Sequence, residues 1–139
     1  MSIVQTQTTS FKEQLYSGVH NLLTNSLYIA LYTGNANLNE ATTVYSSTNE
    51  ITGTGYVAGG QLITGVTVQS DGYTAYVSFA NPYWSPAAFT TRCALIYNAT
   101  QGNKSICVLD FGSDKTCTTT FTITLPANTS TSALIRSSN

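Results

Sequence analysis

The sequence predicts an all-β fold, a β-sandwich or jelly-roll-like domain with one short N-terminal α-helix. Charged residues make up only 8% of the 139 residues, against about 25% in typical soluble domains. Threonine, a β-branched residue that favours strands, is the commonest residue, whereas lysine and glutamate are scarce. Short apolar or alternating runs, ended by Asn, Gly or Pro, recur along the chain at strand length.

A single helix is expected near the N-terminus. Ser10 and Glu13 have the spacing of a capping box, in which each side chain satisfies a free amide at the helix start. Apolar residues follow at helical spacing, so the pattern predicts a helix over residues 10–23. Residues 1–9 are polar and aperiodic, and we expect a flexible arm.

Strands follow from residue 27 onward. Residues 27–32 form a continuous apolar run, which predicts the first strand. The glycines of residues 53–60 indicate positive-φ turns or a bulge. Residues 62–68 and 73–79 alternate between apolar and polar, and a turn at residues 70–72 is expected to join them as a hairpin.

The centre of the core is predicted at residues 93–97 and 105–111. These two runs are apolar on successive residues and are separated by a short polar loop. Such runs are typical of strands that are covered on both faces. Their cysteines, Cys93 and Cys107, could be cross-strand neighbours in this hairpin.

The chain ends after one more strand. Residues 112–115 are expected to turn the chain into a strand at residues 121–125, whose alternate residues are apolar. Residues 127–139 form a Ser/Thr-rich tail. We therefore predict a flexible arm over residues 1–9, one domain over residues 10–126, and a tail beyond it.

The three cysteines predict buried free thiols. Their number is odd and no CxxC spacing occurs, which disfavours a disulfide framework or a zinc site. A buried cysteine behaves as a small hydrophobic residue. We expect this state for Cys93, Cys107 and Cys117.

The charge pattern disfavours nucleic acid and membrane partners. The formal net charge is -1, and the cationic residues are scattered instead of forming a basic stripe. No run is long and apolar enough to span a bilayer, and the first residues lack the features of a signal peptide. A surface with so few charges is poorly protected against association, which favours a subunit that is covered by neighbours.

The sequence contains no recognisable catalytic constellation, cofactor motif or metal motif, so a non-enzymatic protein is expected. His20 has no accompanying nucleophile motif and is expected to be a partly exposed residue late in the helix. Asp110 interrupts a buried strand, where pairing with Arg92 or a backbone donor would satisfy it. Spacing alone leaves a glycosidase-type carboxylate pair open, but no feature points to one.

An aromatic pair and the apolar residues of the two ends are the candidate interface. Tyr83 and Trp84 lie between two prolines, where they could stack on a sugar, anchor an interface or plug the open end of the sandwich. The ends offer apolar side chains that could dock on a neighbour. The candidate interface residues are Ile3, Val4, Tyr83, Trp84, Leu134 and Ile135.

Five segments carry a family resemblance along nearly the whole chain. They are IALYT at 29–33, TGTGYVAGGQ at 52–61, FANPYW at 79–84, ALIYN at 94–98 and GNKSICVLDFG at 102–112. With the early helix, they resemble a family of small virion structural proteins of tailed bacteriophages. In that family alanine or valine occupies the position of Cys107, so the thiol is a departure that fits a packing role.

The resemblance implies a capsid decoration (cement) protein. Such a protein would be a homo-oligomeric β-domain on the phage head surface, would bind the major capsid protein or other virion proteins, and would assemble in the host cytoplasm. A neck or tail component is the alternative within the virion. A carbohydrate-binding or depolymerising module is the alternative of a different class, and it rests on Tyr83, Trp84 and scattered carboxylates.

Overall fold

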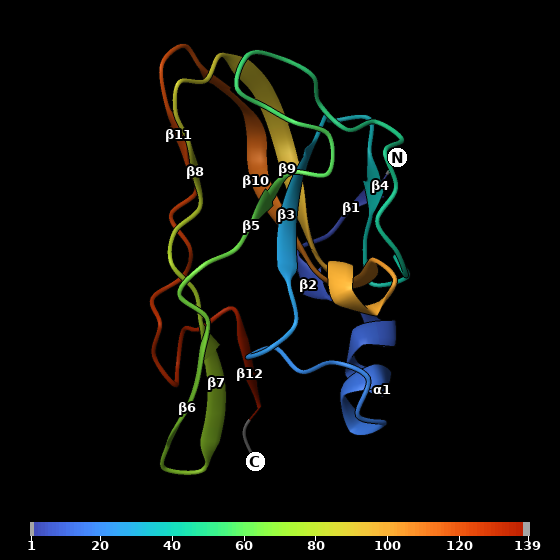
Figure 1. The fold of residues 1–139 in the computed structure, drawn as a ribbon, viewed down its shortest axis with the longest axis vertical. Helices are drawn as coiled ribbons and strands as arrows, with labels where there is room; N and C mark the ends of the chain where they lie inside the picture. Colours follow the sequence, from blue (N-terminus) through green and yellow to red (C-terminus); the bar gives the residue numbers. More distant parts are fainter. Residues whose placement is uncertain (1, 138–139) are drawn as a thin grey trace.

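The computed structural model describes residues 2–137 and confirms an all-β domain with one short α-helix (Figure 1). Met1, Ser138 and Asn139, which belong to the predicted arm and tail, lie outside the described residues. A five-stranded sheet forms the middle layer. Its order is β2 (Thr6–Gln7), β10 (Lys104–Cys117), β9 (Phe89–Asn98), β3 (Leu27–Tyr32) and β5 (Gln61–Leu62).

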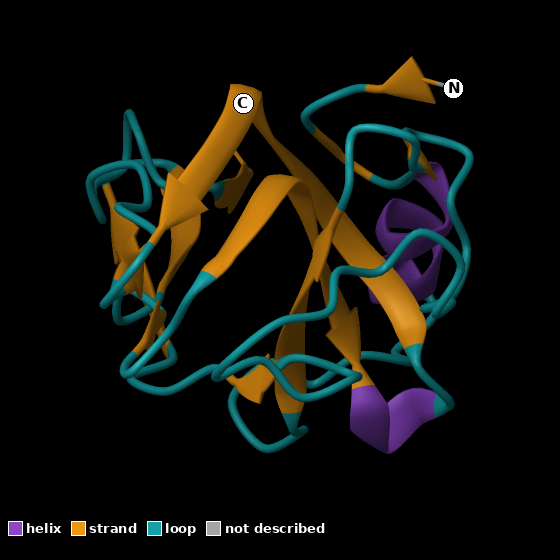
Figure 2. Ribbon diagram, turned by 90° about the horizontal axis from the view of Figure 1, so that it is seen from above, coloured by secondary structure: helices purple, strands orange, loops and turns teal. Residues whose placement is uncertain are grey.

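Smaller sheets cover both faces of this middle layer. On one side lie β8 and β11, together with the hairpin β6–β7 and its neighbour β12; on the other lie β1 and β4 (Figure 1). These strands are β1 (Ser2–Ile3), β4 (Asn37–Leu38), β6 (Thr67–Asp71), β7 (Thr74–Ser78), β8 (Tyr83–Trp84), β11 (Phe121–Thr122) and β12 (Ile135–Ser137). The two helical segments, α1 (Thr9–Tyr16) and the 3-10 turn η1 (Ala99–Gln101), lie on one side of the molecule (Figure 2).

The predicted central hairpin is confirmed as β9 and β10. Alternate residues enter two separate apolar clusters: Ile96 and Ile106 belong to the larger one, and Leu95 and Val108 belong to the smaller one. All four side chains are completely inaccessible to solvent. Burial on both faces explains why these runs are apolar on successive residues.

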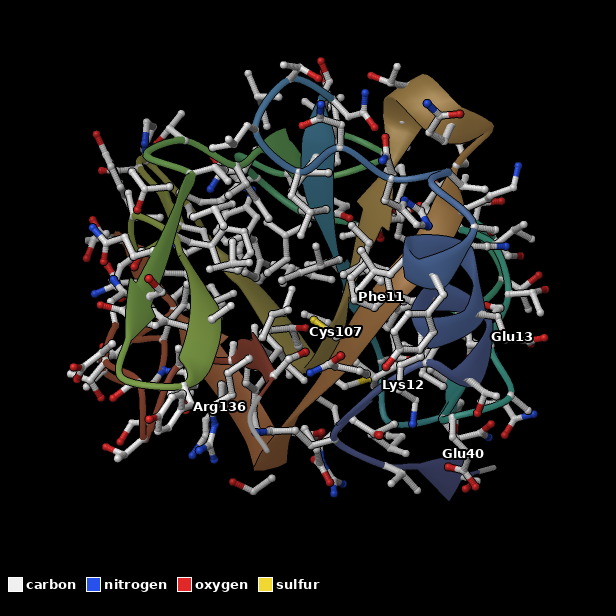
Figure 3. All side chains as sticks on the ribbon, turned by 90° about the horizontal axis from the view of Figure 1, so that it is seen from below. Phe11, Lys12, Glu13, Glu40, Cys107 and Arg136 are labelled. Carbon is white, nitrogen blue, oxygen red and sulfur yellow. The ribbon has the colours of Figure 1, made fainter. Side chains whose placement is uncertain are left out.

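The cysteines are buried and free, as predicted, but Cys93 and Cys107 are not cross-strand neighbours. The register places Cys107 opposite Ile96 and Cys93 opposite Asp110. The two thiols also belong to different clusters, on opposite faces of the sheet. Cys107 points into the interior (Figure 3).

The predicted turn at residues 112–115 is wrong, because β10 continues to Cys117. The register shifts between Asp110 and Lys115, so the extra residues form a bulge in β10. Gly112 lies in the bulge with a φ of 83°. Arg92 Nε donates to Asp110 Oδ1 at 3.3 Å, which confirms the predicted pairing, and the Gly112 amide donates to the same oxygen at 2.8 Å.

The helix is shorter than predicted and has a different cap. Thr8, not Ser10, is the N-cap, and its Oγ1 accepts a hydrogen bond from the Phe11 amide at 3.3 Å. The helix ends at Tyr16, just before Gly18, which has a φ of 77°. The apolar residues beyond it lie in a loop, where Leu22 is buried and Leu23 is exposed.

The second predicted hairpin is present in part. It consists of β6 and β7, which are joined by a two-residue turn at Gly72 and Tyr73. Residues 62–66 do not belong to β6, because Ile63 donates instead to Leu27 O at 2.8 Å and Gly65 turns the chain with a φ of 68°. All of β6 is exposed to solvent.

The described parts of both chain ends contain short strands, within the segments expected to be a flexible arm and a Ser/Thr-rich tail. β1 pairs with β4 in parallel, and β2 extends the central sheet beside β10. β12 pairs with β7. Ile135 is buried in the larger cluster and Ile3 packs against the smaller one, so each end is held by apolar contact as well as by backbone hydrogen bonds.

In the described part of the chain, no helix is long and apolar enough to cross a bilayer.

We expect Leu95→Ala and Val108→Ala to lower the free energy of unfolding by about 2–4 kcal/mol each, because each would leave a cavity in the smaller cluster. Urea denaturation followed by fluorescence measures the loss. Leu62→Ala is the matched control: Leu62 is 49% exposed, so its loss should be within about 0.5 kcal/mol. Equal losses for all three variants would contradict the assigned core.

Candidate functional site

The candidate interface residues have very different environments. Tyr83 is 62% exposed and Val4 is 41% exposed. Ile3 and Leu134 are half-buried and pack against the two apolar clusters. Trp84 and Ile135 are buried core residues. Only Tyr83 and Val4 therefore remain available for contact as the domain stands.

Trp84 is the centre of an aromatic cluster. Its ring centroid lies 5.9 Å from that of Phe121, 6.3 Å from that of Phe89 and 6.4 Å from that of Tyr56. The strand pair β8–β11, in which Trp84 faces Phe121, holds the ring over the central sheet. For Trp84, this arrangement therefore favours a core residue that plugs the end of the sandwich over a residue that stacks on a sugar or anchors an interface.

Tyr83 borders a polar pocket of about 460 Å³ between β5 and β8. Its lining includes Gln61, Leu62, Asn81 and Ser85, and none of the described residues that line it is charged. Gln61 Nε2 donates to Tyr83 O at 2.9 Å, which fixes one wall. A neutral polar ligand is the kind that such a pocket could take.

An apolar groove of about 450 Å³ lies between the residues around the end of α1 and the sheet β6–β7–β12. Leu15, Leu23 and Val68 border it and are 37%, 58% and 49% exposed. Val77 and Ile135 also line it and are buried. We call this surface the α1–β12 groove.

The helix predicted over residues 10–23 included the two exposed leucines of the α1–β12 groove, Leu15 and Leu23. Leu15 does lie in α1, but the helix ends at Tyr16, before Gly18, so Leu23 lies in the loop that follows; both side chains are exposed. Gly18, inside the run of apolar spacing, was the available signal for an early helix end. Arg136 is the one charged residue among those that line the groove in residues 2–137, and Figure 3 labels it.

Glu50 organises a cluster of tyrosines, which sequence reasoning missed. Tyr45 OH donates to Glu50 Oε1 at 2.6 Å, and Tyr56 OH donates to Glu50 Oε2. The Gly59 amide donates to Oε2 at 2.7 Å, and Tyr97 OH donates to Gly59 O at 2.6 Å. The carboxylate thus holds the loop of residues 52–60 against β3 and β9.

The glycines of this loop are required by its close approach to the sheet. Gly53, Gly55, Gly59 and Gly60 all have positive φ, as the sequence predicted. A Cβ atom on Gly60 would lie 1.8 Å from Ile29 O, so no other residue fits there.

The tyrosine hydroxyls keep their protons in this environment. Burial, reinforced by the nearby Glu50 carboxylate, raises the pKa of Tyr32, Tyr45 and Tyr56 well above the usual value. The same causes raise the pKa of Tyr97 to about 12. Neutral hydroxyls donate to the carboxylate and to backbone carbonyls, which is a structural role.

His20 is buried, which corrects the expectation of a partly exposed helix residue. Its ring lies in the loop after α1, where Asn98 Nδ2 donates to Nδ1 at 3.0 Å and Nε2 donates to Gln14 Oε1 at 2.9 Å. Burial, followed by the positive charge of Lys104, lowers the pKa of His20. The neutral ring therefore ties α1 and its following loop to β9.

Within residues 2–137, no group of three or more His, Cys, Asp or Glu side chains is placed to hold a metal ion. The chain matches no protein-family model, no curated protein and no solved structure. The polar pocket beside Tyr83 and the α1–β12 groove are two surfaces of the described chain with a shape suited to binding.

We expect the free energy of unfolding to fall as the pH rises above about 10, the pKa of a tyrosine in an unfolded chain. Tyr32, Tyr45, Tyr56 and Tyr97 have raised pKa values when folded. Their contribution to stability is complete below pH 10 and is lost as the pH approaches the folded values. Urea midpoints measured between pH 9 and 11.5 test this, and a constant midpoint would contradict it.

We expect Trp84→Ala to destabilise the fold by about 3–5 kcal/mol, because it empties the centre of the aromatic cluster. Tyr83→Ala, next to it but 62% exposed, is the control and should cost less than about 0.5 kcal/mol. Thermal melts of the two variants give the comparison. If Trp84→Ala were as stable as wild type, Trp84 would not be a core residue, and it would again be a candidate for the interface.

Proposed function

We propose that this protein is a structural component of a tailed-bacteriophage virion, and specifically a capsid decoration protein. It binds major capsid subunits on the outside of the head and is assembled with them in the host cytoplasm. The five segments that resemble small virion proteins support the virion assignment. The α1–β12 groove is the single structural observation that supports binding to another protein.

The groove has the make-up of a protein-binding surface. Exposed leucine and valine side chains surround buried apolar residues, and such patches mark interaction sites when they are contiguous. Interface cores are poor in charged residues, and Arg136 is the one charged residue that lines the described groove. A capsid segment with apolar side chains would gain most by covering Leu15, Leu23 and Val68.

The proposed activity is stabilisation by preferential binding. A protein that binds the assembled shell more tightly than free capsid subunits shifts the equilibrium toward the shell. Many weak contacts on neighbouring subunits add up, because each bound copy presents its next contact at high local concentration. No catalytic step is needed.

Binding to empty capsids tests the proposal. We expect wild-type protein to sediment with capsids that lack it and Leu23→Asp to bind about 30-fold more weakly, which corresponds to a loss of about 2 kcal/mol at an interface hot spot. Val57→Asp is the matched control, because Val57 is 73% exposed and its loop lies at the other end of the molecule from α1 (Figure 1).

Unchanged melting temperatures for both variants establish that the folds are intact. Equal capsid binding by Leu23→Asp and Val57→Asp would reject the α1–β12 groove as the contact. Failure of wild-type protein to bind capsids, with recovery on neck or tail particles, would favour the alternative virion location. Cryo-EM of labelled virions reads out that location directly.

A carbohydrate-binding module is the second candidate, and the polar pocket beside Tyr83 is the observation that favours it. An exposed tyrosine ring can stack on the apolar face of a sugar while amide side chains bind its hydroxyls. A glycan array separates the two candidates. Glycan binding that Tyr83→Ala abolishes and Leu23→Asp preserves would support the module instead of the decoration protein.

A further inference from the structure

Strand β6 is an open edge. Thr67 to Asp71 are all exposed, and in residues 2–137 β6 pairs only with β7. In Figure 1 the strand lies on the outside of the hairpin, away from β12. An edge of this kind presents unpaired backbone donors and acceptors to any extended chain that reaches it.

The outward groups of β6 belong to Val68 and Ser70. Gly72 and Tyr73 form a two-residue turn, so Asp71 and Thr74 are the hydrogen-bonded closing pair of the hairpin. Bonded and non-bonded pairs alternate along an antiparallel ladder. Gln69 therefore bonds toward β7, whereas the amide and carbonyl groups of Val68 and Ser70 point away from it.

The free edge of β10 offers a contrast within the same molecule. Beyond the short contact with β2, that edge has a bulge between Asp110 and Lys115. Gln5 Oε1 accepts a hydrogen bond from the Asp110 amide at 3.1 Å. Bulges and charged side chains are the devices that keep strand edges from pairing. β6 has no bulge, proline or lysine, and its one charge, on Asp71, is at the turn.

We propose that β6 pairs with β6 of a second copy of this chain, antiparallel and centred on Gln69. In this register Val68 of one copy and Ser70 of the other exchange backbone hydrogen bonds. Each Asp71 faces a Thr67 hydroxyl instead of the other Asp71, so the pairing of identical strands places no like charges opposite each other. Because β6 is complementary to itself in this register, we favour a second copy of the chain over another extended peptide as the partner.

The contact is expected to be weak in solution. Two five-residue strands cover much less than the roughly 1,200–2,000 Å² of a stable interface. Copies held side by side on a larger particle would meet at a high effective concentration, where a weak contact is populated. The inference rests on the geometry of β6 and does not depend on capsid binding.

Cysteine cross-linking of the full chain tests the register. Gln69 would face its own copy as a non-hydrogen-bonded pair, with Cα atoms about 4.5 Å apart, which suits a disulfide. We expect Gln69→Cys to form a disulfide dimer under mild oxidation at least about tenfold faster than Thr67→Cys, whose two copies would lie about 13 Å apart. Wild-type protein, whose cysteines are buried, gives the background.

Charge variants test the same register without a covalent bond. Gln69→Lys places two ammonium groups opposite each other and should weaken self-association about threefold to fivefold in sedimentation experiments. Thr67→Lys, on the same strand, would face Asp71 of the second copy and should leave association unchanged or stronger. Equal cross-linking of the two cysteine variants, or equal weakening by the two lysine variants, would overturn the proposal. Capsid binding is measured in a separate experiment, so the β6 pairing and the proposed capsid binding can be rejected independently of each other.

Discussion

The pairing of β9 with β10 is the constraint on which the rest of the structure depends. Its register places Ile96 and Ile106 on one face of the central sheet and Leu95 and Val108 on the other. The smaller sheets on both sides then pack against side chains whose direction is set by the β9–β10 pairing. β3 and β2 extend the sheet from the two sides of the pair, so both chain halves are joined through it. A one-residue slip would exchange the two faces and bury neither cluster correctly.

Because charged residues are scarce, most side-chain hydrogen bonds in the described chain involve hydroxyl and amide groups. Arg92 and Asp110 form the one ion pair in residues 2–137, and it fixes a bulge. Among the buried hydroxyls, Thr8 Oγ1 and Ser105 Oγ lie 2.9 Å apart, and Ser105 Oγ donates to Thr42 O at 2.7 Å. Such bonds are short and directional, so they fix the positions of loops without the long-range field of a charged surface. A surface left with few charges is also one that tolerates neighbours.

The sequence predicted the features that depend on short stretches of residues. It did not predict the features that depend on contacts between distant segments. The central hairpin was predictable because runs apolar on both faces allow few alternatives, and the positive-φ glycines of residues 53–60 were predictable because that conformation favours glycine. The helix was overextended because spacing alone counted Leu22 and Leu23, although Gly18 had already ended it. Tyr45 and Tyr56 are only five and six residues from Glu50, but they lie in loops without periodicity, and Tyr97 joins the cluster from β9, so hydrophobic periodicity could not reveal it. The α1–β12 groove likewise depends on where β12 returns to β7.

The place of β2 beside β10 has a consequence for how the chain reaches its fold. Thr6 and Gln7 pair with Val108 and Cys107, and Thr8 bonds Ser105 from 97 positions away. At about 5–20 residues per second of synthesis, the N-terminal strand waits roughly 5–20 s for its partner. We expect the first half of the domain to leave the ribosome before the strand that covers its apolar residues, and cooperative folding to begin once β10 has been made. We therefore expect slow folding, because the pairings of β2 with β10 and of β3 with β9 join segments far apart in the sequence.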